Sequence, residues 1–290
     1  MLLGAIEAGG TKIICAVGNE QGKILNLIRI DTDIPEVSIP KVIEYFKKNP
    51  VEAIGVGTFG PAGVNPASPD YGYILKTPKL AWANFNFLGA LKEHFNVPMC
   101  FDTDVNGAAL GEHLWGAAKE VHSCLYITVG TGIGAGAYID GKLLHGLLHP
   151  EMGHILVKPY PRDTYGGCCP FHGSCLEGMA SGPSIEKRWE QKAHLLHPTH
   201  IAWEIEAYYL AQGILSYILI LSPEKIILGG GVMGQQHLLP LIRKNVQSLL
   251  NGYLKLEELN ASIDQYIVSP KLGENAGTYG ALALAIQAIQ

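Results

Sequence analysis

The sequence predicts an α/β protein built from two similar units, each a mixed sheet with helices on its faces. Short apolar runs of β-favouring residues alternate with segments of helical periodicity, a pattern typical of sheets covered by helices. A strand, a glycine-rich turn and a second strand open the chain, and the same order returns after residue 120. Two halves that begin alike indicate a duplicated unit, with a cleft between the two copies.

The first half has a simple order of expected elements. Strands are expected in five apolar runs, at residues 2–7, 12–18, 23–31, 51–60 and 98–104. A helix is expected at residues 39–49, between the third and fourth strands, and another at residues 105–118, directly after the fifth.

The second half repeats the strand–turn–strand opening and then becomes mainly helical. Its strands are expected at residues 123–130, 134–140, 141–146 and 225–231, and its helices at residues 184–196, 202–221, 234–250 and 275–289. No Pro/Ser-rich linker marks a boundary, which we place near residue 115. The expected domains are therefore 1–115 and 116–273, with a C-terminal helix at about 274–290 as a candidate to pack back on the first.

Composition and charge exclude several classes of protein. The 290 residues are 48% hydrophobic and 16% charged, as in a soluble globular protein. A net charge of -5 without a basic run argues against a nucleic-acid-binding surface. No apolar stretch is long enough to span a membrane, and the N-terminal residues do not have the pattern of a secretory signal. We therefore expect a cytoplasmic protein.

The cysteines fall into two groups. Cys15, Cys100 and Cys124 are isolated in apolar runs and are expected to be small buried residues. The other three, Cys168, Cys169 and Cys175, are clustered beside histidines. In a reducing compartment this clustering favours a metal site over a disulfide framework.

Three glycine-rich turns lie at strand ends. In the first, Gly9 and Gly10 expose backbone N–H groups, while Thr11 adds a hydroxyl and Lys12 a charge. The second, "TVGTGIGAG", offers the same N–H groups without a charge, and either turn can form an anion cradle or an ordinary hairpin turn. The third, "ILGGGV", favours a flat ligand lying on the backbone over a loose strand-to-helix loop. None of them matches a dinucleotide-binding or Walker-type motif.

A polar stretch, "DTDVN", lies where a strand is expected to end and a helix to begin. A carboxylate there can simply cap the helix. Alternatively, Asp104 can point into the cleft and take a proton from a hydroxyl nucleophile. Phosphoryl transfer requires phosphate positioning, neutralisation of charge by Mg²⁺ and one base, and the glycine turns with Asp104 would supply those parts.

The motif order resembles that of a known family. The segments are "EAGGTK", "GVGTFGP", "DTDVNGAALGE", "TVGTGIGAG", "HPEMGH", "CPFHGSCLEG" and "LGGGV", and they span nearly the whole chain. They are similar to the ROK family of sugar kinases and sugar-responsive repressors, and most similar to its zinc-bearing fructokinase branch. The resemblance implies an actin-like, duplicated ribonuclease H fold of two domains, with ATP and a hexose meeting in the cleft. It also implies a homodimer.

The resemblance assigns roles to residues at matching positions. Asp104 becomes the catalytic base of an ATP-dependent hexose kinase. The residues implied to face ATP are Gly9, Gly10, Thr11, Lys12, Thr131, Gly132, Pro183, Gly230 and Gly231. Those implied to lie at the sugar are Asn106, Glu151, His154 and Glu177. Fructose is the favoured sugar, with glucose, mannose or an N-acetylhexosamine as alternatives.

The same resemblance implies a structural zinc site in an insertion at residues 149–183. Its ligands would be His154, Cys169, His172 and Cys175. Two thiolates and two imidazoles suit tetrahedral Zn²⁺, and a site closed by four protein ligands is structural rather than catalytic. Cys168 could replace Cys169, but the family register favours the thiol directly before Pro170. His154 would bind zinc with one ring nitrogen and a sugar hydroxyl with the other.

Two positions depart from the family pattern. Glu7 stands where the family usually has Asp, which keeps the charge near Mg²⁺ on a longer side chain. Ser174 stands where many relatives carry an acidic residue. His145 and His149 flank the sugar motif and are given no active role.

Two functions other than a kinase fit parts of the sequence. Sugar-sensing repressors of the family carry an N-terminal helix-turn-helix, whereas this sequence opens on a strand and is acidic. A protein-interaction module that is stabilised by zinc and has no enzymatic activity would leave the glycine turns and Asp104 unexplained. ATP consumption without DNA binding would separate the kinase from both.

Overall fold

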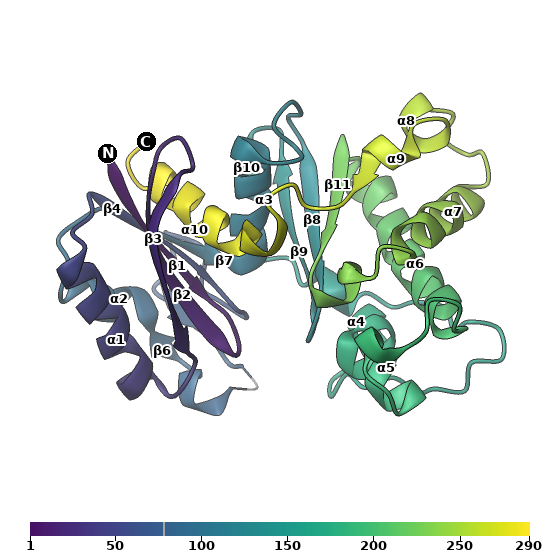
Figure 1. Cartoon of the computed structure of the whole chain (residues 1–290), viewed down its shortest axis with the longest axis horizontal. Coiled ribbons are helices and arrows are strands. Elements are labelled where there is room, and N and C mark those ends of the chain that lie inside the picture. Colours follow the sequence, from purple (N-terminus) through teal and green to yellow (C-terminus); the bar gives the residue numbers. More distant parts are fainter. Residues whose placement is uncertain (78) are drawn as a thin grey trace. The chain divides into compact units, whose positions relative to one another are not determined.

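The computed structural model describes residues 1–77 and 79–290, which divide into two compact units (Figure 1). Unit 1 comprises Met1–Glu120, Gly136–Pro150 and Lys271–Gln290, and unit 2 comprises Val121–Ala135 and Glu151–Pro270. The predicted α/β class is confirmed, because strands and helices alternate along both. No helix among the described residues is long and apolar enough to cross a membrane.

Two five-stranded sheets share one strand order. The first runs β3-β2-β1-β4-β7, with bounds Leu2–Ala8 (β1), Lys12–Asn19 (β2), Ile24–Asp31 (β3), Ala53–Thr58 (β4) and Met99–Thr103 (β7). The second runs β10-β9-β8-β11-β12, with bounds Cys124–Val129 (β8), Ile133–Ile139 (β9), Lys142–Leu143 (β10), Lys225–Gly229 (β11) and Ile267–Val268 (β12). In the first, β1 pairs antiparallel with β2 and parallel with β4, and in the second β8 pairs parallel with β11. The repeated order agrees with the duplication expected from the two similar openings.

The helices follow the predicted order with local differences. Unit 1 has α1 (Pro35–Lys48), α2 (Phe87–Lys92), α3 (Asp104–Trp115) and α10 (Ala276–Gln287). Unit 2 has α4 (Leu176–Ala180), α5 (Gly182–Trp189), α6 (Ala202–Leu221), α7 (Leu238–Leu250), α8 (Glu257–Asn260) and α9 (Ile263–Tyr266). Single 3₁₀ turns lie at Leu80–Trp82 (η1), Met152–His154 (η2), Ala193–Leu195 (η3), Gly231–Gly234 (η4) and Gly273–Asn275 (η5).

Four expectations need correction. The helix expected at 184–196 ends at Trp189, because Glu190 has a left-handed backbone with φ 54°. The helix expected at 234–250 begins at Leu238. The strand expected at 141–146 is only the two residues of β10. The short strands β5 (Tyr73–Ile74) and β6 (Phe85–Asn86), together with α2, were not predicted.

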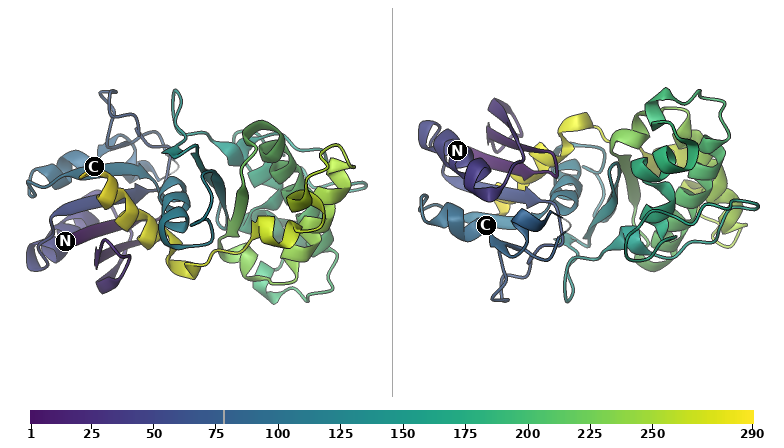
Figure 2. Two further views of the ribbon diagram at one scale, coloured as in Figure 1. Left: turned by 90° about the horizontal axis from the view of Figure 1, so that it is seen from above. Right: turned by 90° about the horizontal axis from the view of Figure 1, so that it is seen from below.

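The C-terminal helix α10 completes the core of unit 1. Its small residues let it lie directly on β4, where Gly55 approaches the Ala281 carbonyl so closely that no Cβ would fit. Both views in Figure 2 show this helix, in yellow, beside the purple and blue elements of unit 1. Residues 136–150 also pack in unit 1, although the sequence placed them in the second domain; one reason is a contact between His145 and Asp102.

Candidate functional site

The predicted base Asp104 lies at the junction of β7 and α3 in unit 1. The buried strand β7 ends at Thr103, whose hydroxyl accepts a hydrogen bond from the Asn106 N–H at 3.2 Å and thereby caps the helix. Asp104 is the first helical residue, is half-buried, and its Oδ1 accepts from the Val105 N–H at 2.9 Å. The strand and the capped helix therefore fix the backbone that carries this carboxylate.

A buried hydrogen-bond network supports that junction. The Asp102 Oδ1 accepts from the Thr103 N–H at 2.7 Å and from the Asn106 side-chain amide at 2.9 Å, and its Oδ2 lies 2.7 Å from the His145 Nε2. The hydrogen bond to Asp102 raises the pKa of His145, partly offset by burial. Sequence reasoning gave His145 no role, because a partner more than forty residues away leaves no local pattern.

Asn106, predicted to lie at the sugar, is fully buried at the centre of this network. Its amide nitrogen binds Asp102 and lies 3.3 Å from the His145 Nε2. Within the part of the chain that the structure describes, its Oδ1 has no hydrogen-bond partner. Because Asn106 is fully buried, its contacts here support a role in holding Asp102 rather than a direct contact with a sugar.

The first glycine turn lies in the same unit. The Gly9 N–H donates to the Lys12 carbonyl at 2.9 Å, which closes the turn, and Thr11 is exposed. A Cβ at Gly10 would lie 3.4 Å from the Lys79 Cε, so Lys79 brings a second cation to this turn. The sequence analysis missed Lys79, which comes from a loop far along the chain.

Glu7, one of the two positions that depart from the family pattern, makes a hydrogen bond within unit 1. Its Oε2 accepts from the Thr278 hydroxyl of α10 at 2.6 Å. Burial raises the pKa of Glu7, while the bond from Thr278 and the charge of Lys12 oppose the rise. The additional methylene of Glu7 is therefore used to reach the C-terminal helix.

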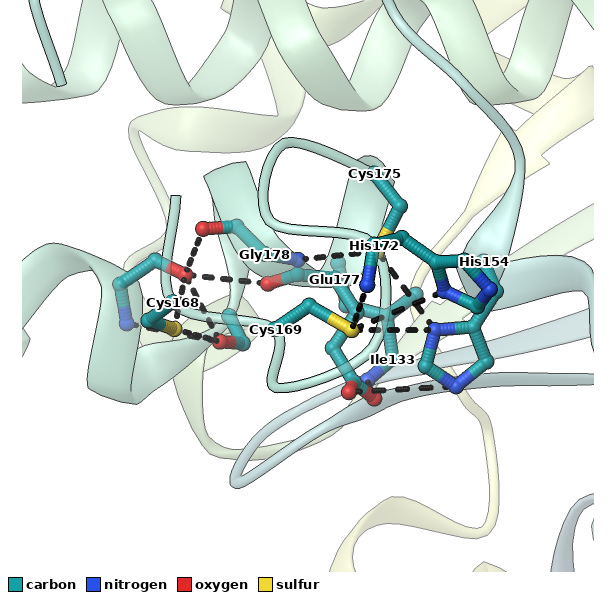
Figure 3. A network of polar contacts seen from close by, with 10 residues as sticks. Ile133, His154, Cys168, Cys169, His172, Cys175, Glu177 and Gly178 are labelled. Carbon is teal, nitrogen blue, oxygen red and sulfur yellow. Dashed lines mark hydrogen bonds and ion pairs between the residues drawn. The ribbon is translucent and has the colours of Figure 1, made fainter. Parts of the chain in front are cut away.

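The four predicted metal ligands lie together in unit 2 (Figure 3). Their ligand atoms all lie within 4.8 Å of one another. The Nδ1 of His154 is 3.7 Å from the Cys169 Sγ and 3.5 Å from the Cys175 Sγ, and the Nδ1 of His172 is 3.7 Å from the Cys169 Sγ.

These separations fit a zinc ion. With Zn–S bonds of about 2.3 Å and Zn–N bonds of about 2.0–2.1 Å, tetrahedral sulfur and nitrogen ligands lie about 3.6 Å apart. Cys168, the alternative ligand, lies away from the histidines in Figure 3, and its Sγ is 3.1 Å from the Ser184 hydroxyl. The geometry therefore favours Cys169 over Cys168.

Two carboxylates flank the metal cluster. Glu177, on α4, directs its Oε1 to within 4.0 Å of the His154 Nε2, the ring nitrogen that faces away from the thiols. Its Oε2 accepts from the Ile133 N–H at 3.0 Å. Burial raises the pKa of Glu151, the neighbouring charge of Glu177 raises it further, and His154 opposes the rise. A carboxylate facing a ligating histidine is a common way to fix the orientation of its ring.

The remaining predicted nucleotide residues also lie in unit 2. The Gly182 N–H, next to Pro183, donates to the Gly130 carbonyl at 2.8 Å, in the turn that carries Thr131 and Gly132. Gly230 has φ 92°, a left-handed conformation that favours glycine, and a Cβ at Gly231 would meet no atom within 4 Å. The third glycine turn therefore leaves open space beside Gly231, where a ligand could approach the backbone.

Comparisons with known proteins identify the family of the chain. A family model described as the ROK family matches residues 3–288. The chain is 53% identical over 289 residues to a putative fructokinase of Bacillus subtilis (strain 168), covering 100% of this chain and 97% of the relative. It is 45% identical over 290 residues to a fructokinase of Pediococcus pentosaceus, covering 100% and 99%.

The fold is also similar to that of a solved structure. A ROK family glucokinase from Streptomyces griseus, in complex with glucose and AMPPNP, matches with a TM-score of 0.78 at 25% identity, covering 99% of this chain and 100% of that chain. Together with the shared strand order of the two sheets, this likeness confirms the predicted actin-like fold.

Proposed function

The chain belongs to the ROK family, and from this premise we propose that it is an ATP-dependent hexose kinase that converts D-fructose to fructose 6-phosphate. The observation that carries the proposal is identity of 45% and 53% over the full chain to relatives described as a fructokinase and a putative fructokinase. The site geometry supports it, because a carboxylate at a strand end and glycine-rich turns are parts that phosphoryl transfer needs.

Asp104 acts as the general base in this proposal. The C6 hydroxyl oxygen of fructose forms a bond to the γ-phosphorus of ATP, its proton passes to the Asp104 carboxylate, and the bond to the β–γ bridging oxygen breaks to release ADP. Mg²⁺, when bound, supplies neutralisation of charge on the phosphate oxygens. The N–H groups of the glycine turns and the ammonium groups of Lys12 and Lys79 add hydrogen bonds and positive charge.

On the sugar side, Glu151, His154 and Glu177 accept and donate hydrogen bonds to hydroxyls. His154, Cys169, His172 and Cys175 would hold Zn²⁺, and the ion would fix the His154 ring so that its Nε2–H can donate. Asn106 contributes by holding Asp102. Pro183 and the glycines at 230 and 231 lie at the nucleoside.

An ADP-release assay across sugars tests this function. With ATP, Mg²⁺ and zinc-loaded protein, we expect kcat/KM for fructose to exceed that for glucose, mannose and N-acetylglucosamine by about tenfold or more, a difference of about 1.4 kcal/mol. A preference for another hexose would correct the substrate and keep the kinase. No sugar-dependent ADP release from any of them would contradict a kinase.

The proposed assembly is a homodimer, as the family pattern implies. Sedimentation of the zinc-loaded protein at micromolar concentration should give twice the 31.2 kDa chain mass. A species of single-chain mass at that concentration would contradict the assignment.

A further inference from the structure

The β8–β9 turn at Gly130–Gly132, a part of the proposed nucleotide site, has few contacts of its own that fix its conformation. It joins two buried strands, Thr131 at its tip is exposed, and within it the Gly130 N–H donates to the Gly132 carbonyl at 2.9 Å. Glycine gives the backbone maximal freedom and contributes no side-chain packing. Contacts from outside the turn must therefore decide its conformation.

The first outside contact comes from Glu177. Its Oε2 accepts from the Ile133 N–H at 3.0 Å, at the point where β9 begins. A Cβ at Gly132 would lie 2.6 Å from the same oxygen, so a side chain at that position would displace the Glu177 carboxylate. A hydrogen bond to an ionised acceptor is stronger than one between neutral groups. Glu177 therefore fixes the outgoing side of the turn.

Two further contacts hold the same turn. The Gly182 N–H donates to the Gly130 carbonyl at 2.8 Å, on the incoming side. Gly153 packs against the Ile133 carbonyl with no room for a Cβ. Both sides of the turn are thus held by backbone or side-chain groups from residues 151–182.

All three contacts come from segments that end at metal ligands. Gly153 directly precedes His154, while Glu177 and Gly182 follow Cys175, which also caps α4 by accepting from the Gly178 N–H at 3.5 Å. Between η2 and α4 the chain has no helix or named strand. A β-bridge between Leu156 and Cys175 and a hydrogen bond from the Leu176 N–H to the Ile155 carbonyl at 2.9 Å join these segments. The cluster of His154 and the two cysteines lies at the same junction, where a bound metal would add a further link (Figure 3).

We propose that Glu177 is a positioning residue that couples the metal cluster to the β8–β9 turn. Zinc would then order the nucleotide site as well as the residues proposed to contact the sugar. The nucleotide part of this inference rests on the proposed kinase function. The His154 Nδ1 faces the thiols and its Nε2 lies 4.0 Å from the Glu177 Oε1, so with zinc bound at Nδ1 the ring proton would be on Nε2, toward Glu177. One Glu177 carboxylate thus faces a metal ligand with one oxygen and the turn with the other.

Hydrogen exchange tests the coupling without any ligand or turnover. After zinc is removed with a chelator, amides of residues 130–133 should exchange at least about tenfold faster, which corresponds to about 1.4 kcal/mol of lost protection. Amides in α10 of unit 1 should be unchanged, which serves as the internal reference. Unchanged exchange at residues 130–133 in a verified zinc-free sample would overturn the coupling.

Two variants at Glu177 distinguish a role in positioning the β8–β9 turn from a general role in folding. Glu177→Ala removes the acceptor and should raise exchange at residues 130–133 with zinc still bound. Glu177→Gln keeps a carbonyl acceptor for the Ile133 N–H and should restore most of the protection. Equal exchange in the two variants and the wild type would overturn the role of Glu177, and zinc content and melting temperature confirm that each variant is folded.

Calorimetry of ADP binding without sugar measures the expected effect on the nucleotide site. Gly132→Ala, which pushes against the Glu177 carboxylate, should weaken ADP binding by about tenfold or more. Gly166→Ala in the metal-bearing segment is the matched control, because a Cβ there would meet no atom within 4 Å. Equal affinity of the two alanine variants for ADP would contradict the inference.

The two proposals fail in different ways. If the zinc-loaded wild type binds no ADP but exchange at residues 130–133 depends on zinc and on Glu177, the coupling holds and the kinase proposal fails. If ADP binds but neither exchange nor affinity responds to zinc or Glu177, the kinase proposal stands and the coupling is wrong.

Discussion

The candidate functional residues of unit 1 and those of unit 2 are held in place by different means. In unit 1, Asp104 follows a buried strand and begins a helix of 12 residues, so regular structure fixes it. In unit 2, Glu151 and His154 lie at a single 3₁₀ turn and Glu177 on a helix of five residues. These short elements lie beside a cluster of four side chains that could hold a metal ion.

The difference reflects how each segment lowers its conformational entropy. The β7–α3 junction is ordered by ladder and helix hydrogen bonds and by the Asp102 network. Residues 155–175 lack such bonds over most of their length. The bridge between Leu156 and Cys175 joins the two ends of this loop, and a metal bound by His154 and Cys175 would add a second link at the same place.

The largest expected effect is at the base in unit 1. Asp104→Asn should lower kcat by about 10²–10⁴, the usual contribution of a general base, while sugar binding and zinc content stay near wild type. Steady-state kinetics and sugar titration check this. Asp70→Asn, at an exposed carboxylate, is the control and should leave kcat unchanged. A kcat near wild type for Asp104→Asn would show that another group takes the proton.

The next effect is at the metal cluster of unit 2. Cys175→Ser should abolish stoichiometric zinc binding and raise KM for the sugar by about tenfold or more, because a ligand is lost and the His154 ring is freed. Metal analysis and kinetics measure both quantities. Cys168→Ser is the matched control and should keep zinc, since the Cys168 Sγ lies by the Ser184 hydroxyl. If Cys168→Ser loses zinc instead, the ligand set is wrong.

The smallest effect concerns the His145–Asp102 pair in unit 1. Because this bond raises the pKa of His145, its stabilisation should be present below the ordinary histidine pKa of about 6.5 and be lost as pH rises through the raised value. The wild type should therefore exceed His145→Gln in free energy of unfolding by more at pH 6 than at pH 9. Because His145 is partly exposed and solvent screens the pair, this change should be below about 1 kcal/mol.

Denaturant titration at the two pH values measures that difference. His94→Gln, at an exposed histidine, should show no such dependence on pH. A difference for His145→Gln that is constant or grows with pH would mean that His145 is not the protonated partner of Asp102.

Local patterns in the sequence predicted most of the fold. Strand–turn–strand openings revealed the duplication, and helical periodicity located α1, α6 and α10 to within a few residues. The early end of α5 was missed because it depends on the left-handed backbone of one residue, Glu190. Such a conformation has no strong signal at a non-glycine position.

The candidate site was predicted where its residues form compact motifs. His154, Cys169, His172 and Cys175 lie near one another in sequence and again in the structure. Contacts between distant segments were not predictable in this way. The pairs Asp102–His145 and Glu7–Thr278 join residues 43 and 271 positions apart. No local sequence pattern identifies the partner of any of these residues.

The place of α10 has a consequence for how the protein forms during synthesis. Seven buried residues make one cluster of unit 1, and they come from both ends of the chain: Leu3, Ala5, Ala16, Ala53, Ala281, Leu282 and Ala285. Every residue of unit 2 leaves the ribosome before α10 does. The strands of unit 1 are therefore synthesised well before α10, and a nascent chain that has completed unit 2 still exposes the apolar surface that α10 will cover, a surface that a chaperone could bind.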